Sequence, residues 1–104
     1  YTMILVDAEC FIAPEHRGEF IREVRKIVPV VRKENGCTRY ELLVGISGDS
    51  YHFLEEWASR NHLDEHIAQP HMQDYFKKTT PWQASPTILR IYEVSSAESV
   101  TMSD

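Results

Sequence analysis

Residues 37–57 read CTRYELLVGISGDSYHFLEEW, a pattern of two strands joined by a short turn. Cys37–Val44 and Tyr51–Trp57 are short runs that contain β-branched, aromatic and large aliphatic residues, which favours strands. Between them, Gly45–Ser50 holds two glycines, one aspartate and two serines, the residue types that supply turn geometry. We therefore expect an antiparallel hairpin at the centre of the chain.

The segment before the hairpin predicts one strand and one helix. Thr2–Phe11 reads as a strand, with one face formed by Ile4, Val6, Ala8 and Cys10. Pro14 suits the first turn of a helix, and an apolar stripe at helical spacing follows it: Phe20, Val24, Ile27, Val28 and Val31. Pro29 falls within this stripe, so we expect a kink or a break there. Asn35-Gly36 ends the segment, because glycine readily takes the left-handed closing conformation.

The segment after the hairpin predicts a second helical unit and a last strand. Ser59 or Asn61 can cap a short helix that runs to about Ile67. Three further elements follow: a helical piece over Pro70–Lys78, a loop framed by Pro81 and Pro86, and a strand over Thr87–Val94. The resulting β-α-β-β-α-β order predicts a ferredoxin-like α+β domain, a four-stranded antiparallel sheet with helices on one face. We expect a single domain over residues 1–95 and a C-terminal tail over 96–104.

The third strand also bears on the oligomeric state. Tyr51, Phe53 and Trp57 lie on one of its sides and Leu54 on the other, so both sides carry apolar residues. A sheet that is buried on both faces in a chain of 104 residues implies a partner. We expect a homodimer that forms an α/β barrel; the alternative is a monomer with an exposed aromatic patch.

Composition excludes several classes of function. The net charge of −5 argues against a nucleic-acid partner, which needs clustered Lys and Arg. No apolar stretch approaches the ~20 residues that span a bilayer, so we expect no membrane partner. The start of the chain carries acids rather than a basic region, so we expect no signal peptide. Two cysteines are too few for a disulfide framework, and we expect a cytoplasmic protein in which both are reduced.

Few motifs point to metal or nucleotide chemistry. His62-Leu63-Asp64-Glu65-His66 fits a zinc pattern, since two histidines four residues apart share a helix face. A catalytic zinc needs a third protein ligand, and nothing in the sequence places one beside this pair, so we expect no metal site. Glycine-rich phosphate loops, the G-x-S-x-G nucleophile motif and C-x-x-C are absent from the sequence.

Two stretches together resemble a known family. Residues 51–76, YHFLEEWASRNHLDEHIAQPHMQDYF, combine an aromatic strand ending in Glu-Glu-Trp, a helix with a histidine, and Pro-His four residues further on. Residues 34–42, ENGCTRYEL, match a Glu-Pro-Gly-Cys-x-x-Tyr-x-Leu run, with Asn35 in place of Pro. In order and spacing these motifs resemble the antibiotic biosynthesis monooxygenase family, and the resemblance covers nearly the whole domain.

The resemblance implies an enzyme that needs no cofactor. Members of that family oxidise electron-rich quinols, phenols or anthrones with O2, so the implied partners are a small aromatic substrate and O2. His66 is the implied catalytic base, because an imidazole titrates near neutrality. The implied substrate-binding residues are Phe53, Trp57, His71, Tyr75 and Phe76. Tyr40 and Glu55 are supporting candidates, and for Glu55 we expect a salt bridge to Arg39 or Arg90 across the sheet.

Three other functions are compatible with the same fold. One branch of relatives processes a phosphorylated autoinducer-2 signal, as an isomerase or a transferase, which would require a basic pocket residue such as Arg39, Arg60 or Arg90. A branch that degrades haem fits poorly, because Tyr1–Phe11 lacks the asparagine on which it relies. The third is a non-enzymatic dimeric ligand-binding module, since ferredoxin-like domains host many roles.

Overall fold

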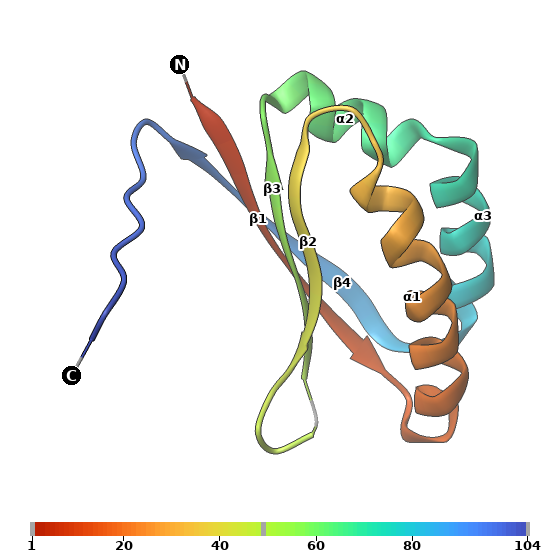
Figure 1. Ribbon diagram of the computed structural model, residues 1–104. Coiled ribbons are helices and arrows are strands. Elements are labelled where there is room, and N and C mark those ends of the chain that lie inside the picture. Colours follow the sequence, from red (N-terminus) through yellow and green to blue (C-terminus); the bar gives the residue numbers. More distant parts are fainter. Residues whose placement is uncertain (1, 49, 104) are drawn as a thin grey trace.

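The computed structural model describes residues 2–48 and 50–103 (Figure 1). Its strands are β1 (Met3–Ile12), β2 (Cys37–Val44), β3 (Tyr51–Trp57) and β4 (Gln83–Val94). Its helices are α1 (Arg17–Arg32), α2 (Arg60–Ala68) and α3 (Pro70–Thr79), with 3-10 turns η1 (Pro14–His16) and η2 (Thr80–Trp82). Within the described residues the strands form one antiparallel sheet in the order β2-β3-β1-β4, and the helices pack on one face. This confirms the ferredoxin-like α+β fold.

Strand β1 is central, and its alternating pattern builds the floor of the core. Its even-numbered residues from Ile4 to Ile12 are buried, while the odd-numbered ones are half-buried. Ile4 pairs with Trp57 and Ala8 pairs with Phe53, so the inward side chains of β1 and β3 share one face. The hairpin bounds agree with the prediction for Cys37–Val44 and Tyr51–Trp57. Of the predicted turn, Asp49 lies outside the described residues.

Helix α1 begins later than predicted and runs through Pro29 without a break. A 3-10 turn holds Pro14, and the helix begins at Arg17. Of the kink or break expected at Pro29, the break does not occur, because α1 continues through Pro29 to Arg32. Ile27 and Val31 are buried on either side of Pro29, and their packing holds the last turn although the proline ring removes one hydrogen-bond donor. Gly36, with φ of 78°, then closes the segment in the left-handed region, as expected.

The second helical unit is divided in two, as the sequence predicts. Ser59 caps α2, its hydroxyl oxygen accepting a 3.3 Å hydrogen bond from the backbone N–H of His62. Gln69 lies between α2 and α3 in an extended conformation (φ −60°, ψ 139°). Pro70 imposes this conformation, because its ring disfavours a helical residue immediately before it. The resulting bend lets both helices cover the sheet.

The predicted start of the last strand was wrong. Strand β4 begins at Gln83 rather than Thr87, and Pro86 lies inside it instead of framing a loop. Pro86 is tolerated because β4 is an edge strand and because its pairing with β1 shifts register between Glu9 and Ile12. Pro81 lies in η2.

The face of the sheet opposite the helices mixes charged and apolar side chains. Nδ1 of His52 lies 2.7 Å from Oδ1 of Asp7, and Arg90 donates a 3.0 Å hydrogen bond to Oε1 of Glu9. On β3, His52 and Glu56 flank Leu54 on this face. This face of the sheet is therefore less apolar than predicted. Exposed apolar side chains also lie here, namely Leu43, Ile88 and Tyr92.

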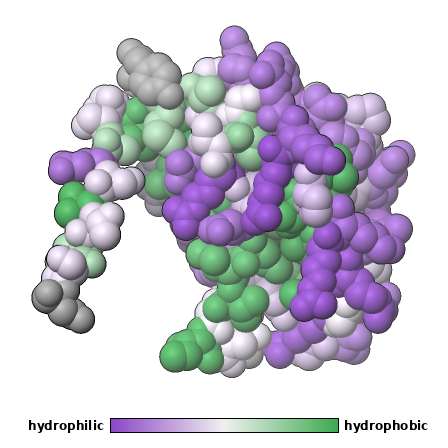
Figure 2. All heavy atoms as spheres, viewed as in Figure 1, coloured by the Kyte–Doolittle hydropathy of each residue, from purple (hydrophilic) through white to green (hydrophobic). Residues whose placement is uncertain are grey.

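The hydropathy of the exposed side chains differs between the helices and the sheet. Figure 2 shows hydrophilic side chains over the helices and apolar ones over the lower sheet and the turn between β2 and β3, where Val44 and Ile46 are exposed. Residues 96–103 form no helix or strand, and the tail leaves the sheet on the side away from the helices (Figure 1). In the described part of the chain, no helix is long and apolar enough to cross a membrane.

Candidate active site

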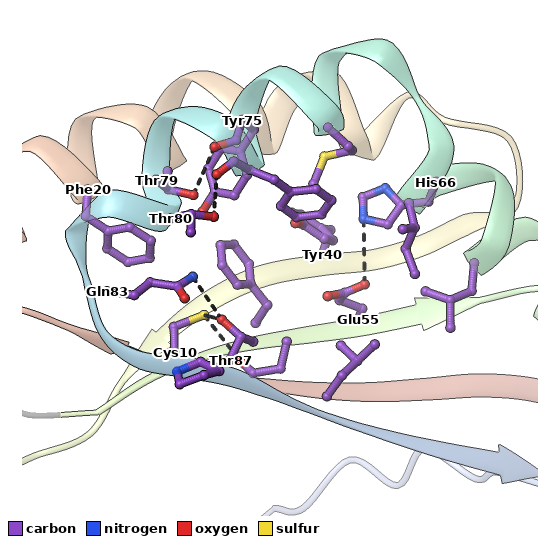
Figure 3. A pocket seen from close by; sticks show the side chains of 18 residues that line it. Cys10, Phe20, Tyr40, Glu55, His66, Tyr75, Thr79, Thr80, Gln83 and Thr87 are labelled. Carbon is purple, nitrogen blue, oxygen red and sulfur yellow. Dashed lines mark hydrogen bonds and ion pairs between the residues drawn. The ribbon is translucent and has the colours of Figure 1, made fainter.

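A cavity of about 340 Å³ lies between the sheet and the helices (Figure 3). Its floor includes Ala8, Cys10, Phe53 and Glu55, and α2 and α3 supply most of its roof. Aromatic rings dominate the lining: Phe20, Tyr40, Phe53, Tyr75 and Phe76. On the β4 side, Pro86, Thr87 and Leu89 line the cavity and are exposed, so the opening lies there. A concave, largely apolar lining with a few polar groups is typical of sites that bind small molecules.

His66 is the histidine of the roof. It lies in the last turn of α2, with only 4% of its side chain exposed, and its ring lies 4.5 Å from that of Trp57. Nδ1 lies 3.0 Å from Oε2 of Glu34, whereas Nε2 lies 4.0 Å from Oε1 of Glu55. A carboxylate only accepts hydrogen bonds, so in neutral His66 the proton belongs on Nδ1 and Nε2 keeps its lone pair.

The environment of His66 favours its neutral form. Burial lowers the pKa of His66 from its usual 6.5, and the hydrogen bond and charge of Glu34 oppose this effect in part. At neutral pH the imidazole is therefore uncharged, and Nε2 is available to accept a proton.

Glu55 is a second titratable group of the same cavity. It lies on the inward face of β3 with 6% of its side chain exposed, and Nε1 of Trp57 donates a 2.9 Å hydrogen bond to its Oε1. Burial raises the pKa of Glu55 to about 7; the hydrogen bond from Trp57 lowers it, and the charge of Glu34 raises it further. Near neutral pH this carboxyl group therefore exchanges between its charged and neutral forms.

The salt bridge expected for Glu55 is wrong. Arg39 pairs instead with Glu41 and Glu56, and Arg90 with Asp7 and Glu9. The reason is the alternation of the pleat, which sends Glu55 to the helix side of the sheet and its neighbours Leu54 and Glu56 to the other. Side chains two residues apart on a strand share a face, so Trp57 can bond to Glu55.

Glu34 is the site residue that sequence reasoning missed. It lies between α1 and β2 with 9% of its side chain exposed, and it contacts two imidazoles. Its Oε2 lies 3.0 Å from Nδ1 of His66 and 2.9 Å from Nε2 of His71. Glu34 opens the ENGCTRYEL run that carried the family resemblance, but nothing local in that run indicates a contact with residues 32 and 37 positions away.

The structure brings most of the predicted site residues to the cavity. Phe53, Tyr75, Phe76, Tyr40, Glu55 and His66 all line it. Trp57 and His71 do not: Trp57 is fully buried behind His66, and His71 lies on the outer side of Glu34. Both touch groups of the site and lie behind the residues that line the cavity.

The two tyrosines that line the cavity stay neutral, because burial raises the pKa of Tyr40 and of Tyr75.

The residues that a metal ion or a phosphate would need can be located among the described residues. His62 and His66 turn to different partners, since Nδ1 of His62 lies 2.7 Å from Oγ of Ser59. Over residues 2–48 and 50–103, no three His, Cys, Asp or Glu side chains are placed to hold a metal ion together. None of the described residues that line the cavity is a lysine or an arginine, and Arg60 pairs with Asp64 on the surface.

The fold and this site define a ferredoxin-like domain with an aromatic-walled cavity, in which a buried histidine lies between two carboxyl groups, those of Glu34 and Glu55. The chain belongs to the antibiotic biosynthesis monooxygenase family, whose model matches residues 3–78. It is 38% identical over 84 residues to the probable quinol monooxygenase YgiN of Escherichia coli K12, covering 70% of this chain and 81% of that protein.

Solved structures share the fold of this chain. A conserved protein from Methanosarcina mazei Go1 superposes with a TM-score of 0.84 at 27% identity, covering 88% of this chain and 91% of that one. Rv0793 from Mycobacterium tuberculosis gives a TM-score of 0.84 at 22% identity, covering 95% and 99%, and shares the fold.

Proposed function

We propose that the protein is a cofactor-independent monooxygenase that oxidises an electron-rich aromatic substrate, a quinol, phenol or anthrone, with O2. The observation that carries the proposal is the neutral His66, whose Nε2 faces an apolar, aromatic-lined cavity. The relative from Escherichia coli, described as a probable quinol monooxygenase, supports the same reaction class.

The site suits proton abstraction from a phenolic hydroxyl. Nε2 of His66 accepts the proton, and the phenolate that results is electron-rich enough to reduce O2 without a bound cofactor. For a quinol, one O2 gives one hydroxyquinone and one water: the ring loses four electrons, O2 gains them, and His66 returns its proton as water forms. The aromatic walls hold the ring and exclude water.

A homodimer forms part of this proposal. Leu43, Ile88 and Tyr92 expose apolar surface on the face of the sheet that no helix covers, and a second copy would bury it. A cytoplasmic location stays a prediction, supported by Cys10 and Cys37, which are both free thiols.

The alternative functions differ in what they require of the cavity. An isomerase of a phosphorylated autoinducer-2-type signal needs a cation against the phosphate, and Arg39, Arg60 and Arg90 all lie on the surface in ion pairs. A non-enzymatic module would bind an aromatic ligand without changing it. Turnover therefore separates the monooxygenase from the binding module.

The test is oxygen uptake by chelator-treated protein with a panel of hydroquinones, naphthohydroquinols and anthrones. His66→Asn keeps a donor toward Glu34 but lacks the base, and we expect it to lose about a hundredfold or more of the rate. His16→Asn is the matched control, since His16 is a half-exposed histidine that bonds Glu19 away from the cavity. No uptake above autoxidation on any substrate, or full activity in His66→Asn, would overturn the proposal.

A further inference from the structure

Glu34 stands between a buried imidazole and a solvent-facing one. The side chain of His66 is 4% exposed, that of Glu34 is 9% exposed and that of His71 is 32% exposed. The contacts of 3.0 Å and 2.9 Å converge on one oxygen, Oε2 of Glu34. A continuous line of polar contacts thus runs from the cavity wall to the surface, through Glu34 and His71, which do not line the cavity.

The outer end of this line opens into a shallow cleft of about 280 Å³ between α1 and α3. Tyr75 lines both this cleft and the cavity, so it forms a wall between them. Besides His71, the charged groups of the cleft are Glu23, Lys26, Asp74 and Lys78. Both lysines lie 3.4 Å from Oε1 of Glu23.

We propose that Glu34 and His71 are positioning residues for His66, in which Glu34 fixes the ring with Nε2 toward the cavity and the charge of His71 is coupled to the base through the shared carboxylate. The inference rests on the proposed role of His66 as base. Glu34 would hold the proton of His66 on Nδ1 and stabilise the imidazolium that forms when Nε2 accepts a proton. His71 adds a second donor that shares the same carboxylate oxygen.

The coupling follows from the shared carboxylate. A proton on His71 puts a positive charge beside Glu34 and makes a second positive charge on His66 less favourable. The charge of His71 accordingly lowers the pKa of His66, whereas Glu34 raises it. On the cavity side, Glu55 and Tyr40 face His66, its ring lying 5.5 Å from that of Tyr40.

Two substitutions should move the site in opposite directions. His71→Gln keeps an amide donor toward Glu34 but removes the charge, so His66 should protonate at higher pH. Glu34→Gln removes the negative charge, so His66 should protonate at lower pH and lose its preference for the Nδ1 proton. Each shift should be on the order of one pH unit. A structural role alone would change stability without giving opposite shifts.

The experiment is a nitrogen-15 NMR titration of the histidine rings in the full chain, together with the pH profile of oxygen uptake. His16→Gln is the matched control: its side chain is 34% exposed and its Nδ1 lies 3.1 Å from Oε1 of Glu19. We expect the His66 titration to be unchanged in the control and shifted oppositely in the two variants, with the acid limb of activity following it. Thermal melts identify any variant that fails to fold, and Glu34→Asp then replaces it as a variant that keeps the charge and displaces its position.

The outcomes distinguish this inference from the proposed function. If the ring of His66 shows the same tautomer and titration in all variants, the positioning roles of Glu34 and His71 are overturned. If the opposite shifts appear in the NMR spectra while no substrate is turned over, the positioning geometry stands and the monooxygenase proposal fails.

Discussion

Nε1 of Trp57 donates a 2.9 Å hydrogen bond to Oε1 of Glu55, two residues earlier on the same strand. The two side chains share the inward face of β3 because the pleat repeats every two residues. This bond gives a buried carboxyl group one partner, while burial still holds its pKa at about 7. The cavity therefore contains a group whose charge changes near neutral pH.

Glu55→Gln should make stability less dependent on pH. Because the folded-state pKa of Glu55 is raised from 4.5 to about 7, its neutral form is favoured by folding, and that stability is lost as pH rises through 7. The variant should be more stable than the wild type at pH 8, by on the order of 3 kcal/mol, and equally stable at pH 4. Urea denaturation at both values measures the difference. Glu56→Gln, on the opposite face, is the control, and an equal gain there would contradict the assignment to Glu55.

Cys10 should react slowly although it lines the cavity. Burial raises the pKa of Cys10 to about 11, so at pH 8 only about one thiol in a thousand is a thiolate. We expect iodoacetamide to alkylate Cys10 slowly in the native protein and rapidly in urea. Mass spectrometry measures the extent of alkylation in both cases. Cys37, whose pKa is also raised to about 11 but which is less buried, should react first. Prompt labelling of Cys10 in the native state would contradict this expectation.

Gly36→Ala should destabilise the fold more than Gly48→Ala. Both glycines have positive φ, 78° and 81°, but a Cβ at Gly36 would collide with the ring of His62, whereas at Gly48 it meets open space. We expect a loss of about 1 kcal/mol at Gly48 from backbone strain alone and at least twice that at Gly36. Chemical denaturation of the two variants tests the order. Equal losses would show that the contact with His62 relaxes without cost.

The homodimer should appear as twice the chain mass of 12.1 kDa in light scattering at micromolar concentration. Ile88→Glu places a charge on the uncovered face of the sheet and should yield a monomer, because a buried unpaired charge is costly. Ile46→Glu, at an exposed position in the turn between β2 and β3, should leave the mass unchanged. A wild-type protein that runs as a monomer would overturn the dimer.

The sequence was most informative where structure depends on local periodicity. The alternation from Ile4 to Ile12 and the turn residues between β2 and β3 predicted the core of the sheet correctly. Two prolines interrupt the structure less than expected: α1 is not broken at Pro29, and Pro86 lies inside β4 instead of framing a loop. In both places tertiary packing or the edge position of the strand compensates for the missing donor, and neither is visible in local sequence.

Only part of the site was predicted, because local motifs do not show which charged groups meet in space. His66 and the aromatic lining followed from motifs, whereas the partners of the charged groups did not. Glu34 reaches His66 only because α1 and α2 lie against the same sheet, and Glu55 bonds Trp57 rather than an arginine because of its face. Such pairings depend on three-dimensional arrangement, which residue spacing along the chain does not encode.

Pro86 also bears on the tendency of this protein to aggregate through its edge strand. An edge strand with a full row of free N–H and C=O groups can template the addition of another chain and so begin aggregation. Strand β4 is such an edge, and at Pro86 it lacks a donor. Because Pro86 also lines the opening of the cavity, a chain that paired with β4 at this position would lie beside the entrance.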